Sequence, residues 1–338
     1  MRSDELISGF DAVLSDLDGV VYVGHEPVPG AVETLKSLSD RGVALAYVTN
    51  NASRSPDQVA QHLQDLGVPA TALQVFGSAP EGAQLLARKL PPGASVLVIG
   101  SQYLKEQAVE VGLTPVDSAD DKPVGVLQGF DSTLAWTDLS EAAYAVASGA
   151  VWVATNTDMS LPGSRGTAPG NGTLVAAVSS ATGKYPEVAG KPEAGLFTTA
   201  ACTLGSHRPL VVGDRLDTDI RGGNRAGMTT ALVMTGVNSW MDALGAPASD
   251  RPDLLLHGLC GLYDSYLPVE ESNGVYRCGK SRAQSDQRTL YVDGDQQNIE
   301  YWRAACASWW ASRPLAESLE LPELVNNGPD IGQGGRPT

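Results

Sequence analysis

The sequence has few cysteines and no pattern that would put them to use. The N-terminus has no basic segment followed by an apolar run, so we expect no secretory signal. Disulfides are rare in proteins that stay in the reducing cytosol. The sequence therefore predicts a cytoplasmic protein with reduced thiols. The four cysteines are widely spaced, with no C-x-x-C pair: Cys202, Cys260, Cys278 and Cys306.

Positive charge is also scarce. The chain carries 23 Lys and Arg residues against 39 Asp and Glu residues, a formal net charge of −16. Nucleic acids and anionic lipid surfaces are bound through an excess of Lys and Arg, so we expect neither as a partner. No apolar run approaches the roughly 18 residues that a membrane span needs. A site for an anion on this chain must therefore be built from a metal ion or a few well-placed cations.

The length and the apolar pattern predict several domains of the α/β class. Hydrophobic residues make up 42% of the 338 residues, which is enough for a buried core. Short apolar runs alternate with helical patterns, which predicts a doubly wound, Rossmann-like parallel sheet over 1–80 and 185–265. A second α/β series, over 81–184, is predicted to be a domain inserted into this core. We expect 266–321 to form a small α+β C-terminal extension and 322–338, rich in Gly, Pro and Asn, a disordered tail.

Acidic residues follow two of the predicted core strands. Asp16 and Asp18 follow the strand predicted over 11–15, and Asp214 follows the one predicted over 209–212. Because ligands bind at the carboxyl edge of an open parallel sheet, these side chains are expected to converge there. Oxygen ligands of this kind suit Mg²⁺. Each segment alone is equally compatible with an acidic turn or a helix N-cap.

Two further segments carry groups that suit a phosphate. The strand predicted over 43–48 ends in Thr49, Asn50 and Asn51, which offer a hydroxyl and backbone N–H groups. Lys191, within a Gly-Lys-Pro sequence, is a fixed cation in a chain poor in cations. No G-x-x-x-x-G-K-[ST] loop occurs, so the chemistry of nucleoside triphosphates has no support.

The order and spacing of these segments resemble the haloacid dehalogenase superfamily of phosphohydrolases. The matching patterns are D-x-D-G-V near the N-terminus, T-N-N after the second strand, K-P after the insert, and G-D-R-x-x-T-D beyond it. The resemblance spans about residues 10–265. The insert resembles the larger α/β cap found in the subfamily of nitrophenylphosphate, phosphoglycolate and nucleotide-type phosphatases. A small-molecule phosphate ester is therefore the expected partner, and a homo-oligomer is left open.

The resemblance implies roles for the two N-terminal carboxylates. Asp16 would attack phosphorus and become a transient aspartyl phosphate that water then hydrolyses. Asp18 would protonate the leaving alkoxide and later activate the water. Dehalogenases of the superfamily lack the second carboxylate, so dehalogenation is disfavoured. Phosphoryl transfer to a sugar, as in a mutase, and a binding module without catalysis remain open alternatives.

The resemblance also implies how the phosphate and the metal would be held. Thr49 and Lys191 would hold the phosphoryl oxygens, with donors from Asn50 and the adjoining Asn51. Mg²⁺ would be bound by Asp16, the main-chain carbonyl of Asp18 and Asp214. Asp219 would orient Lys191 or a metal-bound water.

The insert is expected to choose the substrate, because the core residues contact only the phosphoryl end. The segment 161–172 is predicted to be a Gly- and Pro-rich loop, and Arg165 within it could pair with an anionic group of the substrate or simply be solvated. The candidate substrate-binding residues of the insert are Asn156, Asp158, Arg165 and Asn171.

The insert passage 161–172, the core segment 213–220 and the presence of a C-terminal extension resemble the actinobacterial glycerol-3-phosphate phosphatases, implicated in recycling glycerophospholipid head groups. This favours glycerol 3-phosphate as substrate, with 2-phosphoglycolate, a nucleotide monophosphate or an aryl phosphate as alternatives. In that type the extension resembles an acetyltransferase fold. This chain has no Q/R-x-x-G-x-G/A loop opening a helix. We therefore expect a structural extension, and a truncation near Pro268 that keeps turnover.

Overall fold

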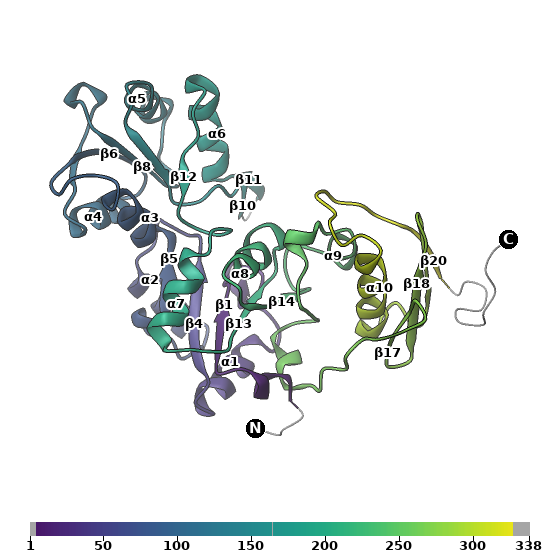
Figure 1. The fold of residues 1–338 in the computed structure, drawn as a ribbon. Helices are drawn as coiled ribbons and strands as arrows, with labels where there is room; N and C mark the ends of the chain where they lie inside the picture. The colour runs from purple at the N-terminus through teal and green to yellow at the C-terminus, as the bar shows by residue number, and fades with distance from the viewer. Residues whose placement is uncertain (1–4, 164, 327–338) are drawn as a thin grey trace.

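A six-stranded parallel sheet forms the core of the computed structural model, which describes residues 5–163 and 165–326 (Figure 1). The strand order is β15-β14-β13-β1-β4-β5, so the chain turns in opposite directions on the two sides of β1. This is the predicted doubly wound arrangement. The strands are β1 (Ala12–Ser15), β4 (Ala44–Thr49), β5 (Val75–Gly77), β13 (Pro209–Gly213), β14 (Thr229–Val233) and β15 (Leu254–Leu256).

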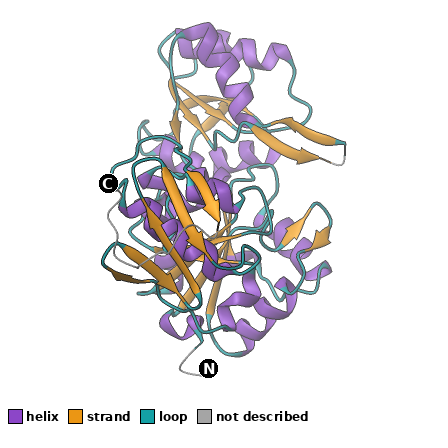
Figure 2. Ribbon diagram, turned by 90° about the vertical axis from the view of Figure 1, so that its right-hand side faces the viewer, coloured by secondary structure: helices purple, strands orange, loops and turns teal. Residues whose placement is uncertain are grey.

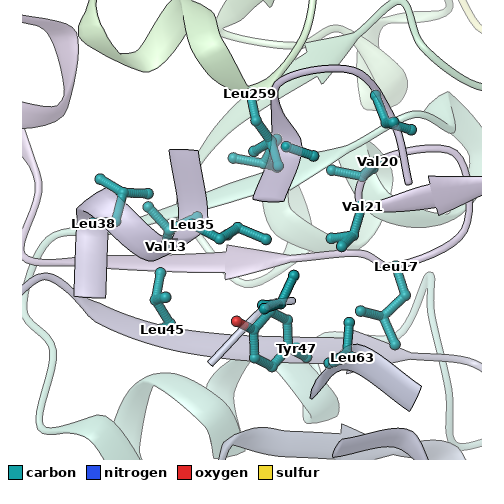
Figure 3. Close-up of a cluster of buried hydrophobic side chains, with 14 of the residues drawn as sticks. Val13, Leu17, Val20, Val21, Leu35, Leu38, Leu45, Tyr47, Leu63 and Leu259 are labelled. Carbon is teal, nitrogen blue, oxygen red and sulfur yellow. The ribbon is translucent and has the colours of Figure 1, made fainter. Parts of the chain in front are cut away.

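Helices cover both faces of this sheet because its strands are apolar on both sides. Val13 packs with Leu45 and Tyr47 under α1 (Ala31–Asp40) and α2 (Pro56–Asp65), as Figure 3 shows. The alternate residues of the same strands pack under α7 (Gly195–Leu204) on the opposite face. The remaining core elements are β2 (Tyr22–Val23), β3 (Glu26–Pro27), α8 (Arg221–Arg225) and α9 (Trp240–Leu244).

The insert forms a second parallel sheet, of order β12-β9-β8-β6-β7, which confirms the predicted inserted α/β fold. Its strands are β6 (Ser95–Ile99), β7 (Thr114–Val116), β8 (Gly125–Gln128), β9 (Val151–Ala154) and β12 (Glu187–Val188). Its helices are α3 (Ser78–Ala87), α4 (Gln102–Glu110), α5 (Trp136–Ala147) and α6 (Asn171–Thr182).

Two details of the insert differ from the sequence prediction. The sheet of the insert extends past residue 184, because β12 pairs with β9 in parallel register. The segment predicted as a loop is mostly an antiparallel hairpin of β10 (Ser160–Gly163) and β11 (Gly166–Pro169). This hairpin projects from the insert (Figure 2). Its Gly and Pro residues mimic a loop pattern, which is why the sequence concealed it.

The C-terminal extension is a five-stranded sheet with one long helix, α10 (Ile299–Ala311), between it and α9 (Figure 1). The predicted tail is wrong in part, because β20 pairs in parallel with β19, and residues 327–338 lie outside the described residues. The strands are β16 (Glu270–Ser272), β17 (Val275–Cys278), β18 (Ser281–Ser285), β19 (Thr289–Asp293) and β20 (Glu323–Asn326).

The extension shares a hydrophobic core with the catalytic domain. Leu232 of β14 and Leu255 of β15 belong to the same buried cluster as Tyr301 and Trp309 of α10. The extension thus covers the part of the sheet face that α7 leaves open. The likeness to an acetyltransferase fold stays a prediction.

The cysteines and the lengths of the helices can be compared with two expectations drawn from composition. All four cysteines are unpaired, with Cys202 and Cys260 exposed and Cys278 and Cys306 buried. Across residues 5–163 and 165–326, every helix is too short or too polar to cross a bilayer.

Candidate active site

The carboxyl ends of β1, β4 and β13 meet beneath the insert and line a cavity of about 330 Å³. Both the core and the insert contribute to its wall. The sheet topology thus brings together the segments that the sequence singled out. The predicted residues on the wall are Asp16, Asp18, Thr49, Asn50, Asn51, Asn156, Asp158, Asn171, Lys191 and Asp214.

Lys191 lies at the base of the cavity between two carboxylates. Its Nζ donates to Asp16 Oδ1 and to Asp219 Oδ1, at 2.6 Å each, and to the carbonyl of Val48 at 3.2 Å. Its side chain is only 3% exposed. Burial disfavours the charged amine, but Asp16 and Asp219 outweigh burial and raise the pKa of Lys191. The cation is therefore fixed beside Asp16, and the predicted contact of Asp219 with Lys191 is present.

Three carboxylates form a cluster at the same place. Asp16, Asp214 and Asp219 each offer an oxygen atom within 4.8 Å of the others. Burial and the neighbouring carboxylates Asp219 and Asp16 raise the pKa of Asp214 to about 8. Burial likewise raises the pKa of Asp16 and, with Asp16 nearby, that of Asp219 to about 6. Such crowded negative charge favours a bound cation.

Asp214 has one carboxylate oxygen held and the other available. Its Oδ2 accepts from the backbone N–H of Val237 at 2.7 Å, while its buried Oδ1 has no hydrogen-bond partner. A buried carboxylate oxygen rarely stays unpaired unless a ligand uses it. Together with the carboxylate cluster, this atom shows that the residues present fit a divalent metal ion.

Glycines allow the loops around Asp214 to approach it closely. A Cβ atom on Gly236 would lie 1.9 Å from Asp214 Oδ2, and one on Gly19 would lie 2.4 Å from it. Gly19 also has a φ of +82°, which favours glycine. Thr235 joins the two loops by donating to the carbonyl of Gly19 at 2.6 Å. The sequence interpretation missed the loop 235–237, whose only signal was its place after β14.

Asn50 connects the loop after β4 with the insert. Its Oδ1 accepts from the Lys191 N–H at 2.8 Å, and its Nδ2 donates to the Lys191 carbonyl at 3.1 Å. The same Nδ2 lies 3.2 Å from each carboxylate oxygen of Asp158. Its neighbours Thr49 and Asn51 turn the loop, since the Thr49 hydroxyl accepts from the Asn51 N–H at 3.1 Å.

Asn156 and Asn171 extend this network into the insert. Asn156 Nδ2 donates to the carbonyl of Asn50 at 2.8 Å, and Asn171 Nδ2 donates to the carbonyl of Asn156 at 2.7 Å. The structure does not bring Arg165 to the cavity. It is exposed at the turn of the β10–β11 hairpin, because the hairpin holds this turn away from the cavity wall.

Arg215, and not Arg165, is the arginine on the cavity wall. It lines the cavity, and its guanidinium binds Asp217 through Nε at 3.1 Å and Nη2 at 2.9 Å. The sequence contained a signal for Arg215, because this residue directly follows Asp214 at the end of β13.

Asp18 also lies on the cavity wall, although the residue as a whole is exposed. Loss of hydration raises the pKa of its carboxyl, with Lys191 and Arg54 opposing the shift.

Comparison with known proteins identifies the class to which this site belongs. Residues 13–114 match the haloacid dehalogenase-like hydrolases, and residues 188–262 match the HAD-hydrolase-like family. The chain belongs to the haloacid dehalogenase superfamily, among its phosphatases, as the four motifs predicted.

Individual relatives show which phosphatases of this superfamily the chain is most usefully compared with. The chain is 49% identical to D-glycerol 3-phosphate phosphatase of Mycobacterium tuberculosis over 326 residues, which cover 94% of this chain and 90% of that protein. It is 39% identical to 5'-nucleotidase YutF of Bacillus subtilis over 231 residues, 68% of this chain and 88% of that protein. The structure of glycerol phosphate phosphatase Rv1692 from M. tuberculosis in complex with magnesium matches with a TM-score of 0.85. That match has 41% identity and covers 96% and 95% of the two chains.

Proposed function

We propose that this chain is a Mg²⁺-dependent phosphomonoesterase that hydrolyses glycerol 3-phosphate through an aspartyl phosphate at Asp16. The observation that carries the proposal is the position of Asp16. It lies 2.6 Å from the Lys191 ammonium and offers an oxygen within 4.8 Å of a carboxylate oxygen of Asp214, on the wall of the cavity. A nucleophile, a fixed cation and a metal-binding oxygen thus surround one point.

Residues of this chain can carry out both steps of the proposed reaction, formation and hydrolysis of the aspartyl phosphate. A carboxylate oxygen of Asp16 attacks phosphorus, and the bond to the leaving alkoxide breaks. Lys191 offsets the charge on the transferred group, while Asn50 keeps the Lys191 backbone in place. Asp18, whose pKa is raised by loss of hydration, gives its proton to the alkoxide. Asp18 then takes a proton from a water molecule whose oxygen bonds to phosphorus, while the bond between phosphorus and Asp16 breaks and inorganic phosphate leaves. Mg²⁺, held by Asp16, Asp214 and the carbonyl of Asp18, would neutralise negative charge on the phosphoryl oxygens.

The shape of the cavity supports a small substrate. Its volume of about 330 Å³ lies at the lower end of the range of small-molecule sites. The insert covers the cavity and limits access to the aspartyl phosphate, which favours hydrolysis over transfer to a second sugar. The similarity to D-glycerol 3-phosphate phosphatase supports the choice of ester. The similarity to the 5'-nucleotidase makes a nucleoside monophosphate the second candidate.

Phosphate release over a panel of esters tests the substrate. We expect kcat/KM for glycerol 3-phosphate to exceed that for phosphoglycolate, nucleoside monophosphates and an aryl phosphate. Equal values across the panel would remove glycerol 3-phosphate as the preferred substrate. Asp16→Asn tests the mechanism, because the amide is a poor nucleophile and turnover should vanish. Residual wild-type turnover in this variant would contradict the aspartyl phosphate.

The division of the chain into domains and the cellular compartment of the protein are proposals as well. We propose a core over 5–77 and 189–265 with an insert between them, since α3 begins at Ser78 and β12 ends at Val188. We also propose that the protein acts in the cytoplasm. The exposed thiols of Cys202 and Cys260 support this, because exposed thiols persist in a reducing compartment.

A further inference from the structure

We propose that the C-terminal extension positions the metal ligand Asp214, through helix α10, helix α9 and the loop that surrounds the aspartate. The inference rests on the proposed metal site and gives the extension a part in it. Three consecutive contacts carry it from α10 to Asp214.

The first contact is between Asp214 and the loop after β14. The Val237 N–H donates to Asp214 Oδ2 at 2.7 Å, and the Asn238 N–H donates to the Asp214 carbonyl at 3.2 Å. The side chain of Asn238 accepts from the N–H of Leu216 at 2.8 Å. Residues 237 and 238 therefore fix both the carboxylate of Asp214 and the chain that follows it.

The second contact is the direct continuation of this loop into α9. Ser239, next to Asn238, is the N-cap of α9, and its hydroxyl accepts from the Asp242 N–H while the Asp242 carboxylate accepts from the Ser239 N–H. Helix α9 has only five residues. A helix this short is unstable alone, so its position depends on what it packs against.

The third contact is between α9 and α10. Trp310 Nε1 donates to the carbonyls of Ala243 and Leu244, each at 3.1 Å, at the C-terminal end of α9. The rings of Trp240 and Trp302 stack with centroids 5.9 Å apart and an angle of 6° between their planes. Helix α10 thus holds both ends of α9, and through it the loop around Asp214.

The chain beyond α9 is tied to the extension as well. The Ala248 N–H donates to the Ala316 carbonyl at 2.8 Å, and Arg251 donates to the Arg313 carbonyl at 2.7 Å. Leu216 and Ile220, which flank Asp219 in sequence, belong to the same buried cluster as α10. A truncation near Pro268 would expose this cluster, so we now expect it to lose metal binding and turnover, contrary to the sequence-based expectation.

Two aromatic residues of α10 offer a matched test in the full-length chain. Trp310→Phe removes the hydrogen bonds to α9, whereas Tyr301→Phe removes a hydrogen bond to Asn326, which lies within the extension. Binding of Mn²⁺, followed by electron paramagnetic resonance, reports metal affinity without substrate. We expect Trp310→Phe to weaken Mn²⁺ binding roughly fivefold, somewhat less than loss of a group that touches a ligand directly.

The control separates positioning from general destabilisation. We expect Tyr301→Phe to lower the thermal midpoint about as much as Trp310→Phe does, with wild-type Mn²⁺ affinity. Excess Mg²⁺ should restore kcat in Trp310→Phe, while KM for the phosphate ester stays unchanged. Wild-type Mn²⁺ affinity in Trp310→Phe, or equal weakening in both variants, would overturn the inference.

A second variant covers a failure of Trp310→Phe to fold. Trp302→Leu removes the stacking on Trp240 and should weaken Mn²⁺ binding in the same direction; unchanged binding would count against the inference. Asp214→Asn serves as the reference for loss of the metal ligand. If the wild-type chain binds no Mn²⁺, the proposed metal site itself is refuted. If the wild-type chain binds Mn²⁺ and replacement of Trp310 or Trp302 leaves the affinity unchanged, only the positioning role of the extension is refuted.

Discussion

Asn50 of the core and Asp158 of the insert contact each other across the cavity, with the Asn50 amide nitrogen 3.2 Å from both oxygens of the Asp158 carboxylate. Because Asn50 also bonds both backbone groups of Lys191, the insert contacts the residue that holds the proposed phosphate-binding lysine. The Asn50 side chain therefore links the insert to the proposed phosphate site.

Replacement of Asp158 tests this link. Asp158→Ala leaves the Asn50 amide nitrogen without its carboxylate partner, and we expect kcat/KM to fall roughly tenfold, as for other groups that orient a residue at the site. Steady-state phosphate release measures the change. Asp120→Ala removes an exposed carboxylate of the insert and should behave as wild type. Equal activity of the two variants would show that the contact is unimportant.

Lys191 should affect both stability and turnover. Lys191→Ala leaves Asp16 and Asp219 buried without their cation, so we expect a loss of about 3 kcal/mol in the free energy of unfolding without metal. Turnover should fall roughly 10²–10³-fold because a donor to the phosphoryl group is lost. Denaturant unfolding and phosphate release measure the two effects.

A double variant separates these two consequences. Lys191→Met combined with Asp219→Asn removes one carboxylate together with the cation, so stability should recover in part while turnover stays low. Recovery of turnover in the double variant would show that Lys191 has a structural role only.

Metal removal should destabilise the protein as well as stop turnover. The carboxylates of Asp16, Asp214 and Asp219 repel one another, and a bound cation relieves this. At 100 times the dissociation constant, Mg²⁺ should add about 2.7 kcal/mol to the stability. Thermal unfolding with chelator and with Mg²⁺ measures it. The same Mg²⁺-dependent shift in Asp214→Asn would place the metal elsewhere.

Gly236 gives a steric test of the position of Asp214. Its Cβ in Gly236→Ala would lie 1.9 Å from Asp214 Oδ2, so the carboxylate must move, and we expect metal affinity to fall by about tenfold or more. Gly9→Ala is a suitable control, since its Cβ meets nothing within 4 Å. Titration calorimetry with Mg²⁺ on both variants checks the prediction; equal affinities would contradict it.

The sequence revealed the residues at the sheet edge because topology alone brings them together. Asp16, Thr49 and Asp214 each end a strand or directly follow one, and parallel strands place such ends on one edge. The direction of a residue on an inserted segment has no such rule. The sequence therefore could not predict where Arg165 lies. The hairpin places it away from the cavity, whereas Arg215 lines the cavity from the core.

The parts that the sequence concealed depend on contacts between distant segments. Leu324 and Val325 make a short apolar run in a region rich in Gly, Pro and Asn, and only pairing with β19 makes them a strand. The shared core of Leu232, Leu255 and Trp309 is equally invisible to local patterns. Such packing joins segments more than 50 residues apart, so a boundary drawn from composition divided one core into two.

Strand β20 is the last described element to leave the ribosome, and it completes the sheet against which α10 packs. Every residue that we propose to be catalytic or metal-binding has been synthesised more than 100 positions earlier. On the proposed positioning role, a nascent chain or a premature-termination product contains all the catalytic groups but holds its metal poorly. Phosphatase activity would then be withheld until translation of the extension is complete.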